Sequence, residues 1–277
     1  PLYSSAASDV YKRQMQTHPD CLPCFMTQAK LIAQRVSDDP DLIFRTVRYA
    51  ASTAIPQADM ARTPAENATI VFRAAAGFLG VVDPYEAEKR RYNGLALGVY
   101  DALKDYCDHA PDPLEAALKV SALGNILDLN IFHDVDMAQI VEKARGVVWG
   151  LSHYERFRRE VTAAQRILIL ADNAGEIVFD RLLVEALPPG TVTYAVKSGP
   201  IANDALLADA EQVGMHKVAR VIETGSDKFG TPLAYCSSRF RAEFAAADMI
   251  ISKGMANIET LSAVSYTHLT LPTNREV

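Results

Sequence analysis

The chain has 277 residues, 49% of them hydrophobic, which is enough to bury a full core in one large or two modest domains. Its 28 Lys and Arg against 34 Asp and Glu give a net charge of −6, and without a cluster of basic residues this argues against nucleic acid as a partner. No apolar run reaches the roughly 18 residues that span a bilayer, and the four cysteines are too few for a disulfide scaffold, so we expect a cytoplasmic protein with no membrane partner.

The two ends of the chain fit one short DNA adapter better than they fit a protein fold. Asp9 to Gln14 reads DVYKRQ and Val264 to Leu269 reads VSYTHL, and one adapter present in both orientations encodes both. The pair resembles the transposon end that is used to fragment DNA for sequencing. We therefore ascribe residues 1–14 and 263–277 to the adapter, and expect the natural protein to continue past Ser262, so that the core is C-terminally truncated.

Residues 15–160 have the pattern of an all-helical N-terminal domain. One signal for a helix start occurs three times: a capping side chain, then proline, then glutamate at the third position after the cap. A cap followed by proline or by a helix-forming stretch occurs twice more. The expected caps are Asp39, Thr63, Asp83, Asp112 and Asp136.

Residues 161–262 alternate short β-rich runs with polar loops and helical stretches. The expected strands are Ile167 to Ala171, Val192 to Val196, Val218 to Ile222 and Met249 to Ile251. This alternation predicts an α/β fold, an α/β/α sandwich with a mostly parallel sheet and a Rossmann-like core. In such sheets the ligand lies outside the carboxyl ends of the strands.

Hard metal ligands follow the first two of these strands. Asp172 and Asn173 come directly after the first strand, and Asp204 lies in the loop after the second. Carboxylate and amide oxygens suit Mg²⁺ or Mn²⁺. Turn chemistry is the alternative, in which Asn173 shapes a loop and Asp204 caps a helix. Two such loops at one sheet edge favour a metal site.

Two lysines also leave strand ends. Lys197 and Lys253 could each place an ammonium against a phosphate oxygen, or could simply be solvated. The loop that contains Gly225 resembles an anion-binding loop, but with low specificity. Asn125 and Asp128 share a helix face that could line a cleft between the domains, or they could cap a helix end.

Cys21 and Cys24 have the spacing of half a zinc site or of a thioredoxin-like pair. The sequence contains no second pair to complete a zinc site, and no strand precedes the cysteines as thioredoxin requires. A structural role is therefore the alternative to a redox or metal role.

Six segments in order resemble one family. They read DCLPCFMTQ, SALGNILDLN, ADNAGEIVFD, VKSGPIANDA, ETGSDKFGTPL and ISKGMANIETL, and they are similar to the damage-control phosphatase family, also known as domain of unknown function 89. The N-terminal Cys-x-x-Cys is similar to the stand-alone prokaryotic branch. The resemblance implies a phosphatase that needs Mn²⁺, Ni²⁺, Co²⁺ or Mg²⁺ and hydrolyses small phosphorylated metabolites, such as sugar phosphates, in a damage-control role.

The resemblance also assigns residues. It implies that Asp172, Asn173 and Asp204 hold the metal, and that Asp172, Asp204 and Lys253 act in catalysis. Together with the strand-end loops, it gives the expected substrate-binding residues Asn125, Asp128, Lys197, Ser198, Gly225 and Asn257. One departure is Ala208, where an acidic residue is expected before Asp209.

In the expected mechanism the metal polarises a phosphoryl oxygen and activates a bound water, while Lys253 and Lys197 offset charge on the phosphate. Attack by an aspartyl carboxylate is an alternative route. Two other functions stay open: a carboxyl methyltransferase that uses S-adenosylmethionine, for which no glycine-rich adenosyl loop is seen, and a non-enzymatic redox or metal-sensing module centred on Cys21 and Cys24.

Overall fold

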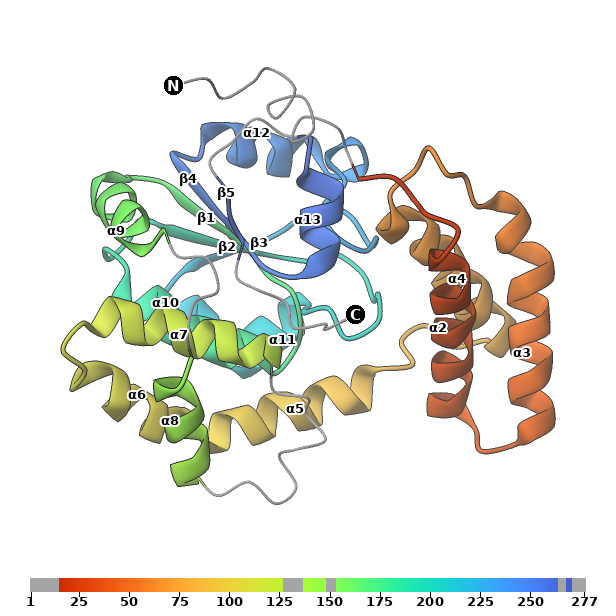
Figure 1. Ribbon diagram of the computed structural model, residues 1–277, viewed down its shortest axis with the longest axis horizontal. Helices are drawn as coiled ribbons and strands as arrows, with labels where there is room; N and C mark the ends of the chain where they lie inside the picture. Colours follow the sequence, from red (N-terminus) through yellow and green to blue (C-terminus); the bar gives the residue numbers. More distant parts are fainter. Residues whose placement is uncertain (1–14, 127–136, 148–152, 264–267, 271–277) are drawn as a thin grey trace.

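The computed structural model describes residues 15–126, 137–147, 153–263 and 268–270 (Figure 1). The described part of the chain begins with three helices that pack on one another at one side of the molecule, away from the sheet. Their shared core contains Phe25, Ile32, Val71 and Phe72. The elements are α2 (Cys21–Val36), α3 (Pro40–Thr53), η1 (Ile55–Gln57) and α4 (Pro64–Leu79). We call them the helical body.

Five further helices connect the helical body to the sheet. α5 runs from the helical body to the sheet, and α7 packs along α10 (Glu176–Ala186) beside the sheet (Figure 1). The five are α5 (Glu86–Gly98), α6 (Tyr100–Asp108), α7 (Pro113–Ile126), α8 (Met137–Arg145) and α9 (Tyr154–Ala163). In the part of the chain that the structure describes, no helix is both long and apolar enough to cross a membrane.

The expected caps at Asp39 and Thr63 are present. The Asp39 carboxylate accepts from the Asp41 backbone N–H, and Thr63 and Glu66 form a reciprocal capping box. α7 begins at Pro113 as expected. The expectation at Asp83 was wrong by two residues, because the Asp83 side chain caps the Tyr85 N–H in a separate turn and α5 begins only at Glu86. The cap expected at Asp136 lies outside the described residues.

The strands form one parallel sheet in the order β3-β2-β1-β4-β5. This confirms the predicted α/β fold. The strands are β1 (Ile167–Leu170), β2 (Val192–Val196), β3 (Arg220–Glu223), β4 (Met249–Ser252) and β5 (His268–Thr270). β5 pairs with β4 and lies in the range 263–277 that the sequence ascribes to an adapter.

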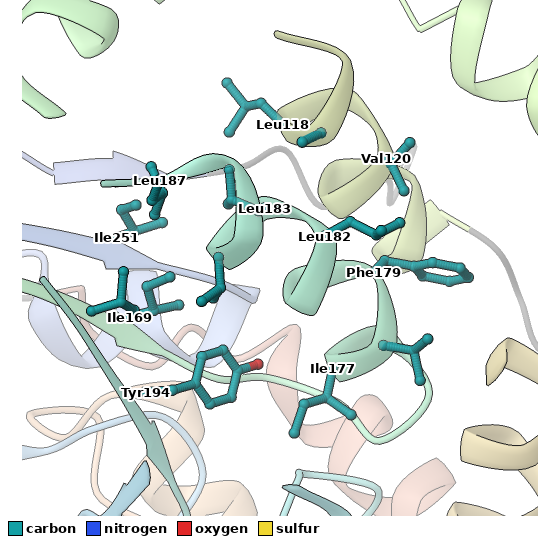
Figure 2. Packing of buried hydrophobic residues seen from close by; sticks show 14 of the residues in the cluster. Leu118, Val120, Ile169, Ile177, Phe179, Leu182, Leu183, Leu187, Tyr194 and Ile251 are labelled. Carbon is teal, nitrogen blue, oxygen red and sulfur yellow. The ribbon is translucent and has the colours of Figure 1, made fainter. Parts of the chain in front are cut away.

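Every residue of β1 is buried because helices cover both faces of the sheet. Side chains alternate between the faces of a strand, so Ile167 and Ile169 join the core with α7 and α10, while Leu168 and Leu170 join the opposite core. Figure 2 shows α10 between this first face and α7, with Phe179 and Leu182 on the side of α10 that faces α7. The remaining helices and short turns are α11 (Leu207–Gln212), η3 (Met215–Lys217), η4 (Leu233–Tyr235), α12 (Ser238–Ala246) and α13 (Met255–Leu261).

The strand order changes direction at β1. The chain moves from β1 to β2 and β3 on one side, and then returns to place β4 on the other side of β1. At such a switch point the loops after the two neighbouring strands separate and leave room for a ligand. The fold therefore puts the loops that follow β1 and β4 at the expected binding edge.

Candidate active site

The loops after β1 and β4 meet at the switch point. Gly254, after β4, has φ of 84° and ψ of 152°, a conformation open essentially to glycine alone. A Cβ atom built there would overlap the carboxylate of Asp172. Glycine therefore lets the backbone of the β4 loop lie directly against the carboxylate that follows β1.

Backbone hydrogen bonds join the β1 loop to the loop after β2. The Ala205 N–H donates to the Asp172 carbonyl at 2.8 Å, and the Ala174 N–H donates to the Asn203 carbonyl at 2.8 Å. As a result Asn173 and Asp204 form an isolated antiparallel bridge. The structure thus brings together the three residues that are expected from the sequence to hold a metal.

The acidic groups of this junction are crowded. Burial raises the pKa of Asp204 to about 6, against the opposing effect of Lys197, whose Nζ lies 3.6 Å from Asp204 Oδ2. Burial, followed by Glu176 and Asp204, holds the pKa of Asp172 well above its usual range. Carboxylates brought this close favour either a bound proton or a bound cation.

Glu176 is a site residue that was not predicted from the sequence. It opens α10, it is buried, and its Oε2 lies 3.4 Å from the Asn173 side-chain nitrogen. Its Oε1 contacts the Lys253 ammonium. Burial raises the pKa of Glu176 to about 7, although Lys253 lowers it. The sequence signal for Glu176 is its position in the Asp-Asn-Ala-Gly-Glu run. A Glu that begins a helix directly after a strand lies at the same edge of the sheet as the residues that follow the strand.

Lys253 lies beneath the loops and is fully buried. Its Nζ donates to the Ser121 carbonyl at 3.0 Å and contacts the carboxylates of Glu176 and Asp180. Burial lowers the pKa of Lys253, but Asp180 and Glu176 outweigh this and raise it. An ammonium has three N–H groups, and three protein acceptors surround this one. In this arrangement Lys253 therefore balances the negative charge of Glu176 and Asp180, and its contact with a phosphate remains a prediction.

Lys197 is also buried, and its ammonium contacts the Gly230 carbonyl as well as Asp204. Ser198 accepts from the Gly225 N–H at 2.6 Å through its hydroxyl, which ties the β2 loop to the β3 loop. Gly225 has φ of 77°, and a Cβ there would collide with Ser237. These three expected substrate-binding residues thus lie at adjacent strand ends.

The Asn257 side chain forms hydrogen bonds with other groups of the protein. Its side-chain nitrogen donates to the carbonyls of Lys253 and Ala171, and its oxygen accepts from the Thr231 hydroxyl at 2.7 Å. The residue is buried. It connects three loops to one another, so its expected contact with substrate remains a prediction.

The end of α7 lies against the start of α10. A Cβ built at Gly124 would be 2.6 Å from the Phe179 ring and 3.0 Å from Glu176 Cγ. Asn125 is the next residue of α7, but its side chain is outside the described part, as is all of Asp128. Cys21 and Cys24 are free thiols in the first turn of α2, in the helical body.

α5 contributes residues that were not predicted from the sequence. The Asn93 side-chain oxygen accepts from the Gly175 N–H at 2.7 Å, and its nitrogen donates to Asp209 at 2.8 Å. Asp209 also accepts from the Leu206 N–H, so it supports the β2 loop beside Ala208. Lys89 is buried, pairs with Asp83 at 2.7 Å and lowers the pKa of Asp204. More than 80 residues along the chain separate Asn93 from Gly175 and from Asp209, so no signal in the sequence pointed to these two contacts.

The residues present fit one hard divalent cation. The four connected carboxylates are Asp172, Glu176, Asp180 and Asp204, and they face the two ammonium groups of Lys197 and Lys253. One divalent ion would neutralise the excess of two negative charges. Among the described residues, no group of three or more His, Cys, Asp or Glu side chains is arranged to hold a metal ion. Two carboxylates and one amide instead leave positions for water and substrate oxygens, as Mg²⁺ and related ions prefer.

Comparisons with known proteins place the chain in a family. Residues 17–273 match the model of the damage-control phosphatase ARMT1-like domain. A damage-control phosphatase from Pyrococcus horikoshii is 32% identical over 91% of this chain and 88% of its own, and one from Archaeoglobus fulgidus is 31% identical over 90% and 88%. The crystal structure of a DUF89 family protein from P. horikoshii superposes with a TM-score of 0.84 at 30% identity, covering 92% of this chain and 91% of that one.

Proposed function

The chain belongs to the damage-control phosphatase ARMT1-like family, and from that premise we propose that it is a metal-dependent phosphatase acting on phosphate monoesters of small metabolites. The relatives named damage-control phosphatases support the phosphatase activity. The observation that carries the metal dependence is the bridge between Asn173 and Asp204, which places two carboxylates and one amide at the switch point.

In this proposal Asp172, Asn173 and Asp204 hold a divalent ion such as Mn²⁺, Mg²⁺, Co²⁺ or Ni²⁺. When bound, such an ion polarises a phosphoryl oxygen and lowers the pKa of a coordinated water. The Asn173 amide nitrogen donates to Asp172 Oδ2 at 2.9 Å and faces Glu176 Oε2. These two contacts fix the orientation of the Asn173 amide beside the Asp172 carboxylate.

The lysines have separate tasks in the proposal. Lys197 lies beside Asp204 at the loop edge and would offset the charge of an incoming phosphate. Lys253 would balance the negative charge of the buried Glu176 and Asp180 carboxylates. Ser198 and Gly225, at the ends of β2 and β3, would contact the phosphate or the metabolite attached to it. A small phosphorylated metabolite, such as a sugar phosphate, is the substrate class that we propose.

A phosphatase assay tests the proposal. The chain should hydrolyse p-nitrophenyl phosphate when Mn²⁺ is added and stop when EDTA removes the metal. Asp172→Ala and Asp204→Ala should each lower the rate by about 100-fold or more, since each removes a metal ligand. Retention of the wild-type rate by both variants would contradict the proposal.

Neither alternative function gains support from the structure or the relatives. Methyl transfer that needs no divalent metal would favour the first alternative, and a module centred on Cys21 and Cys24 would require those thiols for activity. Phosphatase activity that survives Cys21→Ser with Cys24→Ser would count against the second.

A further inference from the structure

Asp180 is a buried carboxylate that the proposed mechanism does not use directly. Its Oδ1 accepts from the Ser121 hydroxyl at 2.7 Å and contacts the Lys253 ammonium, and its Oδ2 accepts from the Tyr194 hydroxyl at 2.6 Å. All four residues are at most 1% exposed. A buried charge is costly unless it is paired and hydrogen-bonded, and this carboxylate has three partners.

The four residues of this cluster come from different parts of the fold. Asp180 lies on α10, Tyr194 on β2, Ser121 on α7, and Lys253 directly after β4. Figure 2 shows the Tyr194 ring between the sheet and α10. The cluster therefore fixes the position of α10 relative to both the sheet and α7.

Glu176 and Asp180 are four residues apart on α10, so their side chains lie on one face of the helix. Two carboxylates at that spacing repel each other, and the Lys253 ammonium contacts both. Asp180 and Glu176 therefore share one ammonium group. The second oxygen of Glu176 then faces the amide nitrogen of Asn173.

We infer that Asp180 is a positioning residue for the metal site. With Tyr194 it holds the Lys253 ammonium, which fixes the Glu176 carboxylate against the Asn173 amide and so fixes the orientation of that proposed metal ligand. This inference rests on the proposed function, because it requires a metal at Asn173. The converse does not hold: the proposed function can be correct even if Asp180 has no such role.

Two variants test the inference. Tyr194→Phe removes one hydrogen bond to Asp180 and leaves the charges in place, while Asp180→Asn removes the charge that holds Lys253. Loss of an outer support commonly weakens metal binding by about 10- to 100-fold. We expect Tyr194→Phe to raise the Kd for Mn²⁺ about tenfold and Asp180→Asn to raise it closer to 100-fold, both measured by calorimetric titration of Mn²⁺ alone.

A matched control is available on the same helix. The Tyr100 hydroxyl donates to Glu185 of α10 at 2.5 Å, outside the cluster. Tyr100→Phe removes the same kind of bond, and its Kd for Mn²⁺ should stay within about twofold of wild type. At saturating Mn²⁺ the Tyr194→Phe variant should also regain most of its rate of p-nitrophenyl phosphate hydrolysis, which a purely structural defect would not allow.

The wild-type and variant results separate the two claims. If the wild type binds Mn²⁺ and hydrolyses the ester, but Tyr194→Phe has the same Kd and the same metal dependence, the inference is overturned and the proposed function stands. If the wild type neither binds Mn²⁺ nor hydrolyses the ester, the proposed function fails and the inference fails with it. Tyr194→Phe decides the question even if Asp180→Asn does not fold.

Discussion

Gly254 lies against the carboxylate of Asp172, with no room for even one additional carbon atom between them. The contact joins the ends of β4 and β1, which are neighbours in the sheet but 82 residues apart along the chain. It depends on a backbone conformation, φ of 84° and ψ of 152°, that side chains other than glycine's rarely allow.

Gly254→Ala should therefore damage the site more than the fold. We expect it to lower the free energy of unfolding by about 1–3 kcal/mol through backbone strain, and to displace Asp172 so that Mn²⁺ affinity falls by at least about tenfold. Gly94→Ala is the control: Gly94 lies within α5, where an added methyl group would have no atom within 4 Å, and alanine there should stabilise the helix by about 0.5–1 kcal/mol. Urea unfolding and metal titration would show whether the two variants differ in this way.

Gly124→Ala should act on Glu176. The added methyl group would press on the Phe179 ring and on the Glu176 side chain, and overpacking of this kind costs about 1–3 kcal/mol. Because Glu176 faces Asn173, we also expect weaker Mn²⁺ binding. Gly77→Ala, at an open position on α4, should instead stabilise its helix by about 0.5–1 kcal/mol and leave Mn²⁺ binding unchanged. Equal Mn²⁺ affinity in the two variants would show that the α7–α10 contact does not influence the site.

Phe229→Ala should loosen the loop after β3 from the helical body. The Phe229 ring packs edge-on against Phe72 at 6.0 Å between centroids, and its N–H donates to Thr69 at 3.1 Å. The next residue, Gly230, is the carbonyl partner of Lys197. We expect a loss of about 2 kcal/mol in unfolding free energy and a severalfold higher KM for p-nitrophenyl phosphate.

Phe44→Ala is the control for that change, because Phe44 is 66% exposed on α3. It should leave both the unfolding free energy and the KM close to wild type. A KM that is unchanged in Phe229→Ala would mean that the helical body does not position Lys197.

Glu259→Gln should alter the pH dependence of stability. Burial raises the pKa of Glu259 from 4.5 to about 7 in the folded chain, although a hydrogen bond from the Ala65 backbone lowers it. The folded state therefore binds an extra proton between these values, so this group's contribution is fully present below pH 4.5 and is lost as the pH rises to 7.

The variant carries no such charge, so its stability relative to wild type should increase between about pH 5 and pH 8 by up to about 3 kcal/mol. Chemical unfolding at the two pH values would measure this, with Glu211→Gln as the control for loss of one exposed carboxylate. A constant difference between variant and wild type across that range would contradict it.

The local parts of the site could be read from the sequence because each follows a strand directly. Asp172 and Asn173 come after β1 and Asp204 lies in the loop after β2, and parallel strands bring these ends to one edge. The fold class followed from the same alternation of strands and helices. Four of the strands lie within two residues of their expected positions.

The supports of the site could not be predicted, because they join segments that are distant in the sequence. Asp180 meets Lys253 across 73 residues, and Asn93 meets Gly175 across 82. Residue type did not reveal these contacts either: Lys253, which is expected from its place at a strand end to contact a phosphate, is buried against two carboxylates. Periodicity and capping patterns carry no information on such contacts.

The central claim is that Asp172, Asn173 and Asp204 hold the ion on which phosphate hydrolysis depends. The most direct measurement is a calorimetric titration of Mn²⁺ into the wild-type chain and into Asp204→Asn, which keeps the shape of the side chain but removes its charge. The account predicts a saturable site in the wild type and affinity weakened by about 100-fold or more in the variant. Equal affinity and equal stoichiometry in the two proteins would contradict it.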